Sequence, residues 1–180
     1  VELFGGEGFL MIGKRAFESG NIKAALTVYQ QALLSDPTNV EALAQGATMR
    51  YLLGDGAAAV ADYTRALQMD PQQPTAHNGL GVVLAEKGKF ADAIDHFQKA
   101  VQFLEQKKGI ATRPLAEAYR NWGLALWQLG DRDNALRRLE SAVRSDSGFG
   151  PARRDIGQLK IELGDLAGAR KELLDATRLD

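Results

Sequence analysis

The stretch LGDGAAAVADYTRALQMDP, residues 53–71, places five alanines around a single tyrosine, between a Gly-Asp pair and an Asp-Pro pair. Ala59, Tyr63 and Ala66 are four and three residues apart, so they share one face of a helix. A face that is small, then large, then small lets a second helix approach to about 8–10 Å while the ring fills one wide gap. The stretch therefore predicts a helix that packs closely against another helix.

The same pattern recurs along the chain, and a glycine precedes it each time. These glycines are separated by 34, 34, 42 and 34 residues: Gly20, Gly54, Gly88, Gly130 and Gly164. Five repeat units follow, at about 6–39, 40–73, 74–107, 116–149 and 150–180, with an insert at 108–115. Because a repeat buries its apolar face only against its neighbours, we predict one domain over residues 1–180.

Each unit predicts two antiparallel helices joined at the aligned glycine. Glycine ends the first helix because it readily adopts the left-handed conformation found at helix ends. A residue that can cap the second helix follows in four units: Asn21, Asp55, Asp131 and Asp165. Lys89 occupies this place in the third unit, so we expect a different cap there. Further glycines inside the first helices indicate close contact with the second helices: Gly13, Gly81, Gly123 and Gly157.

The insert lies around EQKKGIATRPL, residues 105–115. We expect Gly109 to end a lengthened second helix, and Thr112 to Pro114 to open the next helix, since proline is tolerated in a first turn. Two interpretations stay open. The insert is either a long loop without a function or an added lip on one edge of the repeat array.

Composition excludes several classes of function. Twenty-two Lys and Arg against 23 Asp and Glu give a formal net charge of −1, so no overall field attracts nucleic acid or an anionic membrane. No apolar run is long enough to cross a bilayer, and VELFGGEGFLMIG lacks the basic start of a signal peptide. We therefore predict a soluble protein without direct membrane insertion. The absence of cysteine is compatible with both the cytoplasm and a bacterial periplasm.

The sequence offers no catalytic motif. The glycines at 79–81 resemble part of a phosphate-binding loop, but helix packing is the favoured interpretation because no strand precedes them. His77 and His96 have no partners at the spacing of a metal site or a catalytic triad. We therefore expect no enzyme activity, no metal and no cofactor.

The alignment resembles the tetratricopeptide repeat, a helix pair of 34 residues with Ala-x3-Phe and a final proline in its second helix. Ala59 and Tyr63 match the first of these features, and Pro37 and Pro71 match the second. The resemblance implies an all-α fold, a right-handed superhelical α-solenoid of antiparallel helix pairs. It also implies that the first helices line a concave groove that holds a peptide of a partner protein.

On that pattern the groove residues are Lys14, Phe17, Tyr51, Asn78, Arg120, Leu124, Trp127, Arg154 and Gln158. Tyr51 and Trp127 either contact a ligand or cover a neighbouring helix. Arg120 and Arg154 occupy equivalent places in adjacent units, about 10 Å apart. They either grip a carboxylate of an extended ligand, which would make binding sensitive to salt, or are two solvated arginines.

Two functions follow from this reading. The first is a non-catalytic protein–protein interaction module that binds a peptide or helical segment, in a bacterial assembly, secretion or pilus-type machine. The alternative is a structural adaptor or scaffold that works through its solenoid ends. We expect one set of apolar residues to lie on the side that a sixth unit would cover, which favours truncation or a homo-oligomer through that end: Ala169, Leu173, Ala176 and Leu179.

Overall fold

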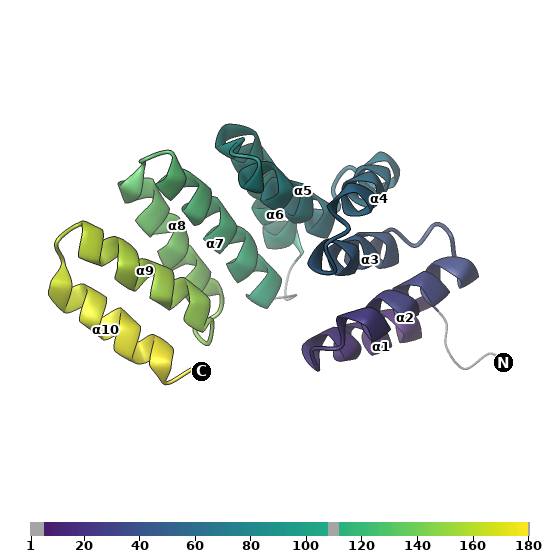
Figure 1. Ribbon diagram of the computed structural model, residues 1–180, viewed down its shortest axis with the longest axis horizontal. Helices are drawn as coiled ribbons and strands as arrows, with labels where there is room; N and C mark the ends of the chain where they lie inside the picture. The colour runs from purple at the N-terminus through teal and green to yellow at the C-terminus, as the bar shows by residue number, and fades with distance from the viewer. Residues whose placement is uncertain (1–5, 108–111, 180) are drawn as a thin grey trace. The chain divides into compact units, whose positions relative to one another are not determined.

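A computed structural model describes residues 6–107 and 112–179 (Figure 1). Those residues contain ten α-helices and no strand, which confirms the predicted all-α class of antiparallel helix pairs. The helices are α1 (Gly6–Glu18), α2 (Ile22–Ser35), α3 (Val40–Leu52), α4 (Gly56–Met69), α5 (Pro74–Glu86), α6 (Phe90–Gln106), α7 (Thr112–Gln128), α8 (Arg132–Ser145), α9 (Gly150–Glu162) and α10 (Leu166–Thr177).

The helices belong to two compact units whose boundary falls inside α5. The N-terminal unit runs to Val83 and the C-terminal unit begins at Leu84. In the N-terminal unit α2 packs against α1 and α3, and α4 packs against α3. In the C-terminal unit each helix from α6 to α9 packs against the next one along the chain. Within each unit, contacts between consecutive helices therefore build the core, as expected for a repeat protein.

The turns within the helix pairs have the predicted chemistry. All five aligned glycines adopt a positive φ, between 73° and 88°, which other residues adopt only with strain. Asn21 caps α2 by accepting a hydrogen bond from the backbone N–H of Ala24 at 3.0 Å. The predicted aspartates cap α4, α8 and α10 in the same way. Lys89 precedes α6 without a side-chain cap, so the third unit departs from the other four as expected, but no other described side chain caps the helix in its place.

The small–large–small faces of α2, α4, α8 and α10 each pack against their own first helix. In α2, Ala25, Tyr29 and Ala32 are all buried. A Cβ atom on Gly13 of α1 would lie 2.6 Å from Cε1 of Tyr29, so only glycine fits there without a shift. A Cβ atom on Gly123 of α7 would likewise lie too close to Leu139 of α8, and one on Gly157 of α9 too close to Leu173 of α10. In these three pairs, the glycine inside the first helix therefore makes room for one large side chain of the second helix.

Tyr63 of α4 is the largest fully buried side chain of the described residues, with an exposed fraction of 1%. Its ring packs against Ala44 and Ala47 of α3 and against Ala76 of α5. Burial raises the pKa of Tyr63 to about 12, so its phenol stays protonated at neutral pH and lies 2.9 Å from Oγ1 of Thr48. Tyr63 thus joins three helices of the N-terminal unit.

The segment around the insert follows the prediction where it is described. Helix α6 has 17 residues, against 14 in α2, α4 and α8, so the second helix of the third unit is lengthened. Pro114 stands in the first turn of α7, as expected. Gly109, and with it the choice between a loop and a lip, lies outside the described residues.

An aromatic stack joins the lengthened α6 to the two helices that follow. Tyr119 and Trp122 of α7 stack with ring centroids 6.3 Å apart and an interplanar angle of 5°. The guanidinium carbon of Arg138 in α8 lies 4.0 Å from the Trp122 ring centroid, and the Tyr119 hydroxyl donates to Glu105 of α6. Because a cation over an indole face is attracted to it, the stack stabilises the packing of these three helices.

The small–large–small face of α10 contacts its own first helix and also borders an open hollow. Ala169 and Ala176 are buried, and Leu173 lies against Gly157 of α9. Ala169 and Leu173 also line the apolar hollow beside α10. The equivalent face of α8 packs against both α7 and α9. Self-association through the α10 face stays a prediction.

Other apolar side chains occupy the outer side of α10. Leu166 and Leu174 have exposed fractions of 67% and 50%. Leu179 is also exposed, but it follows the end of the helix at Thr177. Leu166 and Leu174 are therefore the most exposed apolar residues within α10, beside the half-buried Leu173.

Candidate functional site

The first helices of the C-terminal unit carry five of the nine predicted groove residues. Helix α7 supplies Arg120, Leu124 and Trp127, which are half-buried, and α9 supplies Arg154 and Gln158, which are exposed. Helical spacing of three or four residues puts each set on one face of its helix. We call these five residues the α7–α9 face.

Arg120 is engaged by an acidic residue of α9 that lies outside the predicted groove set. Its Nε donates a hydrogen bond to Oδ2 of Asp155 in α9 at 2.5 Å. Both side chains are partly shielded from water. The charge of Arg120 is therefore balanced inside the protein, so a ligand carboxylate would have to compete with Asp155 for it.

Trp127 also links α7 to α9. Its Nε1 donates to Oε2 of Glu162 at 3.0 Å, and the same oxygen accepts from Nε of Arg132 at 3.3 Å. The ring packs against the core cluster that contains Leu139 and Ile156. The indole thus covers the neighbouring helix, which was one of the two interpretations of Trp127. Part of its surface remains exposed.

The two acidic partners, Asp155 and Glu162, could have been found from the sequence by one signal. Both lie 35 residues after the residue that they bind, one more than the repeat length. A residue of α7 therefore contacts not its repeat equivalent in α9, which is 34 residues later, but the residue that follows this equivalent. A search for complementary residues 35 apart would have located both pairs.

The remaining predicted residues lie in the N-terminal unit. Lys14 and Phe17 of α1 are exposed, and Nζ of Lys14 lies 3.8 Å from Oε1 of Glu18. Tyr51 of α3 is half-buried against the cluster around Tyr63, so it covers a core in the same way as Trp127. Asn78 of α5 is half-buried as well.

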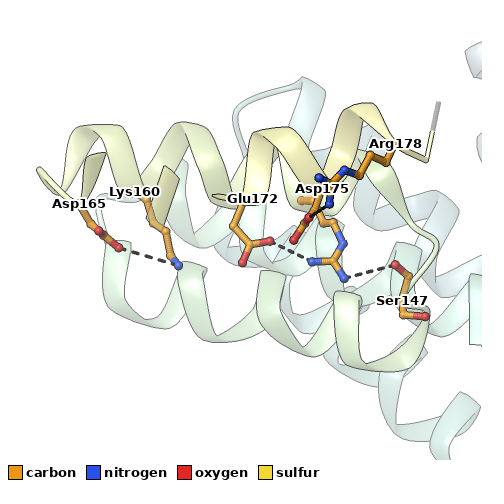
Figure 2. A network of polar contacts seen from close by, with 7 residues as sticks. Ser147, Lys160, Asp165, Glu172, Asp175 and Arg178 are labelled. Carbon is orange, nitrogen blue, oxygen red and sulfur yellow. Dashed lines mark hydrogen bonds and ion pairs between the residues drawn. The ribbon is translucent and has the colours of Figure 1, made fainter. Parts of the chain in front are cut away.

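The position of α9 is also supported by a polar network on its α10 side (Figure 2). Nη1 of Arg153 lies 3.1 Å from Oε2 of Glu172, and these side chains are only 19% and 17% exposed. Nη2 of Arg153 also reaches the carbonyl of Ser147 at 3.4 Å. At the exposed end of α10, Arg178 pairs with Asp175 at 3.3 Å.

Replacing Glu172 with Gln should destabilise the protein by about 1–2 kcal/mol, because it leaves the Arg153 charge shielded and without its carboxylate. This is less than the cost of breaking a fully buried pair, since both side chains retain some contact with water. Urea denaturation followed by far-UV circular dichroism measures the change.

Asp175→Asn is the matched control. Arg178 is 78% exposed, so loss of this second pair should change the stability by less than about 0.5 kcal/mol. Equal effects of the two substitutions would contradict the importance given to shielding.

Family comparisons agree with the repeat pattern. Two tetratricopeptide repeat models match the chain, one at residues 10–55 and 47–107 and the other at 126–180. The DnaJ homolog subfamily C member 3 of Rattus norvegicus is 30% identical over 96 residues, which are 53% of this chain and 19% of that protein. The chain thus spans about a fifth of the length of that curated relative.

Solved structures show the same fold. A thermophilic TPR protein of Thermus thermophilus has a TM-score of 0.79 at 22% identity, covering 97% of this chain and 91% of that one. PilW, described as a type IV pilus biogenesis factor, has a TM-score of 0.76 at 20% identity, covering 97% and 77%. At these identities the likeness shows the fold alone, an α-solenoid of helix pairs. In the described part of the chain, every helix is too short or too polar to cross a membrane.

Proposed function

Because the chain belongs to the tetratricopeptide repeat family, we infer that it is a non-catalytic module that binds a peptide or helical segment of a partner protein on its first helices. Proteins of this family mediate protein–protein interaction. The observation that carries the proposal for this chain is the α7–α9 face, where Leu124 and Trp127 of α7 lie on a surface that also carries polar side chains of α7 and α9. On such a surface the apolar side chains supply contact area, and the polar side chains fix the orientation of a bound extended segment.

The polar contacts already made by the α7–α9 face determine which groups remain for a ligand. Asp155 and Glu162 already engage Arg120 and Trp127. A ligand therefore gains most from the uncovered part of Trp127, from Leu124 and from the exposed amide of Gln158. Because a ligand acid at Arg120 would exchange one ion pair for another, we expect a weaker dependence of binding on salt than two solvated arginines would give.

The machine to which the module belongs is a second part of the proposal. The likeness to PilW supports a role in a bacterial assembly such as a pilus-type machine. What PilW and this chain share is the architecture of stacked helix pairs. The alternative, an adaptor that works through a solenoid end, is favoured by the exposed leucines of α10.

Binding can be tested with a defined probe. A 12-residue peptide selected from a phage-displayed library on the 180-residue chain is synthesised and titrated by calorimetry. Trp127→Ala should weaken its binding about thirtyfold, the loss typical of an aromatic at the centre of an interface. Gln158→Ala, at an exposed site, should weaken it by a smaller factor without a change in thermal stability.

Leu34→Ala is the matched control, because Leu34 is a highly exposed apolar side chain on the second helix α2. This substitution should leave the affinity unchanged. If Trp127→Ala and Gln158→Ala bind the peptide as tightly as the wild type, the α7–α9 face is not the binding surface.

A further inference from the structure

An apolar hollow lies at the outer side of the last helix pair. It has a volume of about 380 Å³, and its walls include Ile161 of α9 and Leu166, Leu173 and Leu174 of α10. Arg170 is the one charged residue in its lining. We call this feature the C-terminal depression. Exposed apolar surfaces of this kind usually mark contacts, and the repeat itself indicates what fits.

The α8–α9 interface provides the template. Nε of Arg132 lies 3.3 Å from Oε2 of Glu162, so the start of α8 meets the end of α9 and the two helices run antiparallel. About one turn further in, Leu136 of α8 belongs to the same core cluster as Leu159 of α9. Where the second helix α8 packs against the following first helix α9, both helices therefore carry an apolar residue at this contact, Leu136 and Leu159.

Helix α10 repeats the α8 pattern with one change. The repeat of 34 residues places Leu173 where α8 has Leu139, but Arg170 where α8 has Leu136. A helix laid on α10 as α9 lies on α8 would therefore set its equivalent of Leu159 beside the Arg170 guanidinium. An acidic residue is favoured at that place, because it would pair with the arginine at the edge of an apolar contact.

A second copy of this chain does not meet that requirement. Alignment of Gly13 with Gly157 shows that α1 carries Arg15 at the place of Leu159, so α1 of a second copy would bring two guanidinium groups together. Two α10 helices paired about a twofold axis near Arg170 would do the same. Like charges brought together at a contact oppose both arrangements.

We propose that the C-terminal depression docks an amphipathic helix of a partner protein that carries an acidic residue opposite Arg170, and that Arg170 keeps a second copy from binding there. The surface is separate from the α7–α9 face, so the proposal stands or falls independently of the peptide binding inferred above.

The test uses a helix that this chain already provides. A labelled peptide of residues 147–164 with Leu159→Glu is titrated against the 180-residue chain by fluorescence anisotropy. The matched control is the same peptide with Leu159→Lys. The Glu peptide should bind about tenfold more tightly than the Lys peptide. General attraction to this acidic protein would favour the Lys peptide, so it cannot produce that result.

Arg170→Glu should reverse the preference of the two peptides, and Leu174→Asp should weaken both. The proposal is overturned if the Glu peptide does not bind, or if wild type and Arg170→Glu prefer the same peptide. It is also overturned if a longer natural form of the protein blocks the peptide, because the occupant is then a segment of the same chain.

Sedimentation velocity tests the second half of the proposal. The wild type should remain monomeric, and Arg170→Leu should form dimers at the same concentration. A wild type that already associates, and that Leu174→Asp dissociates, would make a second copy the occupant. An Arg170→Leu variant that stays monomeric would remove the role given to the arginine.

Discussion

Tyr63→Ala should destabilise the N-terminal unit by about 3–5 kcal/mol, the cost of removing a large aromatic from a closed core. The ring is fully buried among side chains of α3, α4 and α5. Neighbouring alanines are too short to fill the space that it leaves. The substitution also leaves Oγ1 of Thr48 without the phenol that it contacts at 2.9 Å.

Two probes locate this effect. Both tryptophans lie in α7, so tryptophan fluorescence follows the C-terminal unit, whereas circular dichroism follows all helices. Tyr63→Ala should shift the dichroism transition to lower urea. Tyr63→Phe, which keeps the ring and loses only the hydroxyl contact, should cost about 1 kcal/mol. Equal losses for the two variants would show that the cavity is not the cause.

Gly79→Ala should also be destabilising, by about 2–3 kcal/mol, although alanine is the better helix former by about 1 kcal/mol. A Cβ atom on Gly79 would lie 2.5 Å from Cε2 and from the hydroxyl oxygen of Tyr63. The ring is enclosed, so it can make room only by disturbing its neighbours. The free energy of unfolding from urea titration measures the loss.

Gly56→Ala is the control for this prediction. Gly56 begins α4, and a Cβ atom there would have no neighbour within 4 Å. Alanine at this site should be neutral or stabilise the protein by about 0.4–1 kcal/mol, because it restricts the unfolded chain. A gain at both positions would contradict the close approach of Gly79 to Tyr63.

The sequence predicts the features that depend on one helix or one turn. The positive φ of Gly54 and the cap from Asp55 follow from their order in the chain. The burial of Ala59, Tyr63 and Ala66 follows from their spacing. In each case a few consecutive residues and the geometry of the helix determine the outcome.

Features that depend on the register between helices were missed. The pair of Arg120 and Asp155 requires the offset between α7 and α9, which is set by packing over the whole interface. Spacing also identifies the face of α10 that carries Ala169 and Leu173. It does not say how much of that face α9 covers, because this depends on how closely the two helices pack.

The spacing of 35 residues in the pairs of Arg120 and Trp127 means that the repeats are not interchangeable modules. If residues 40–73 were grafted after α8, Gln45 and Leu52 would stand where Asp155 and Glu162 now stand. Arg120 would then face an amide, and the indole N–H would face a hydrocarbon. Asp155 and Glu162 of α9 therefore make the fifth repeat, and not the second, complementary to the fourth. Side chains at the borders between repeats thus determine the order of the repeats.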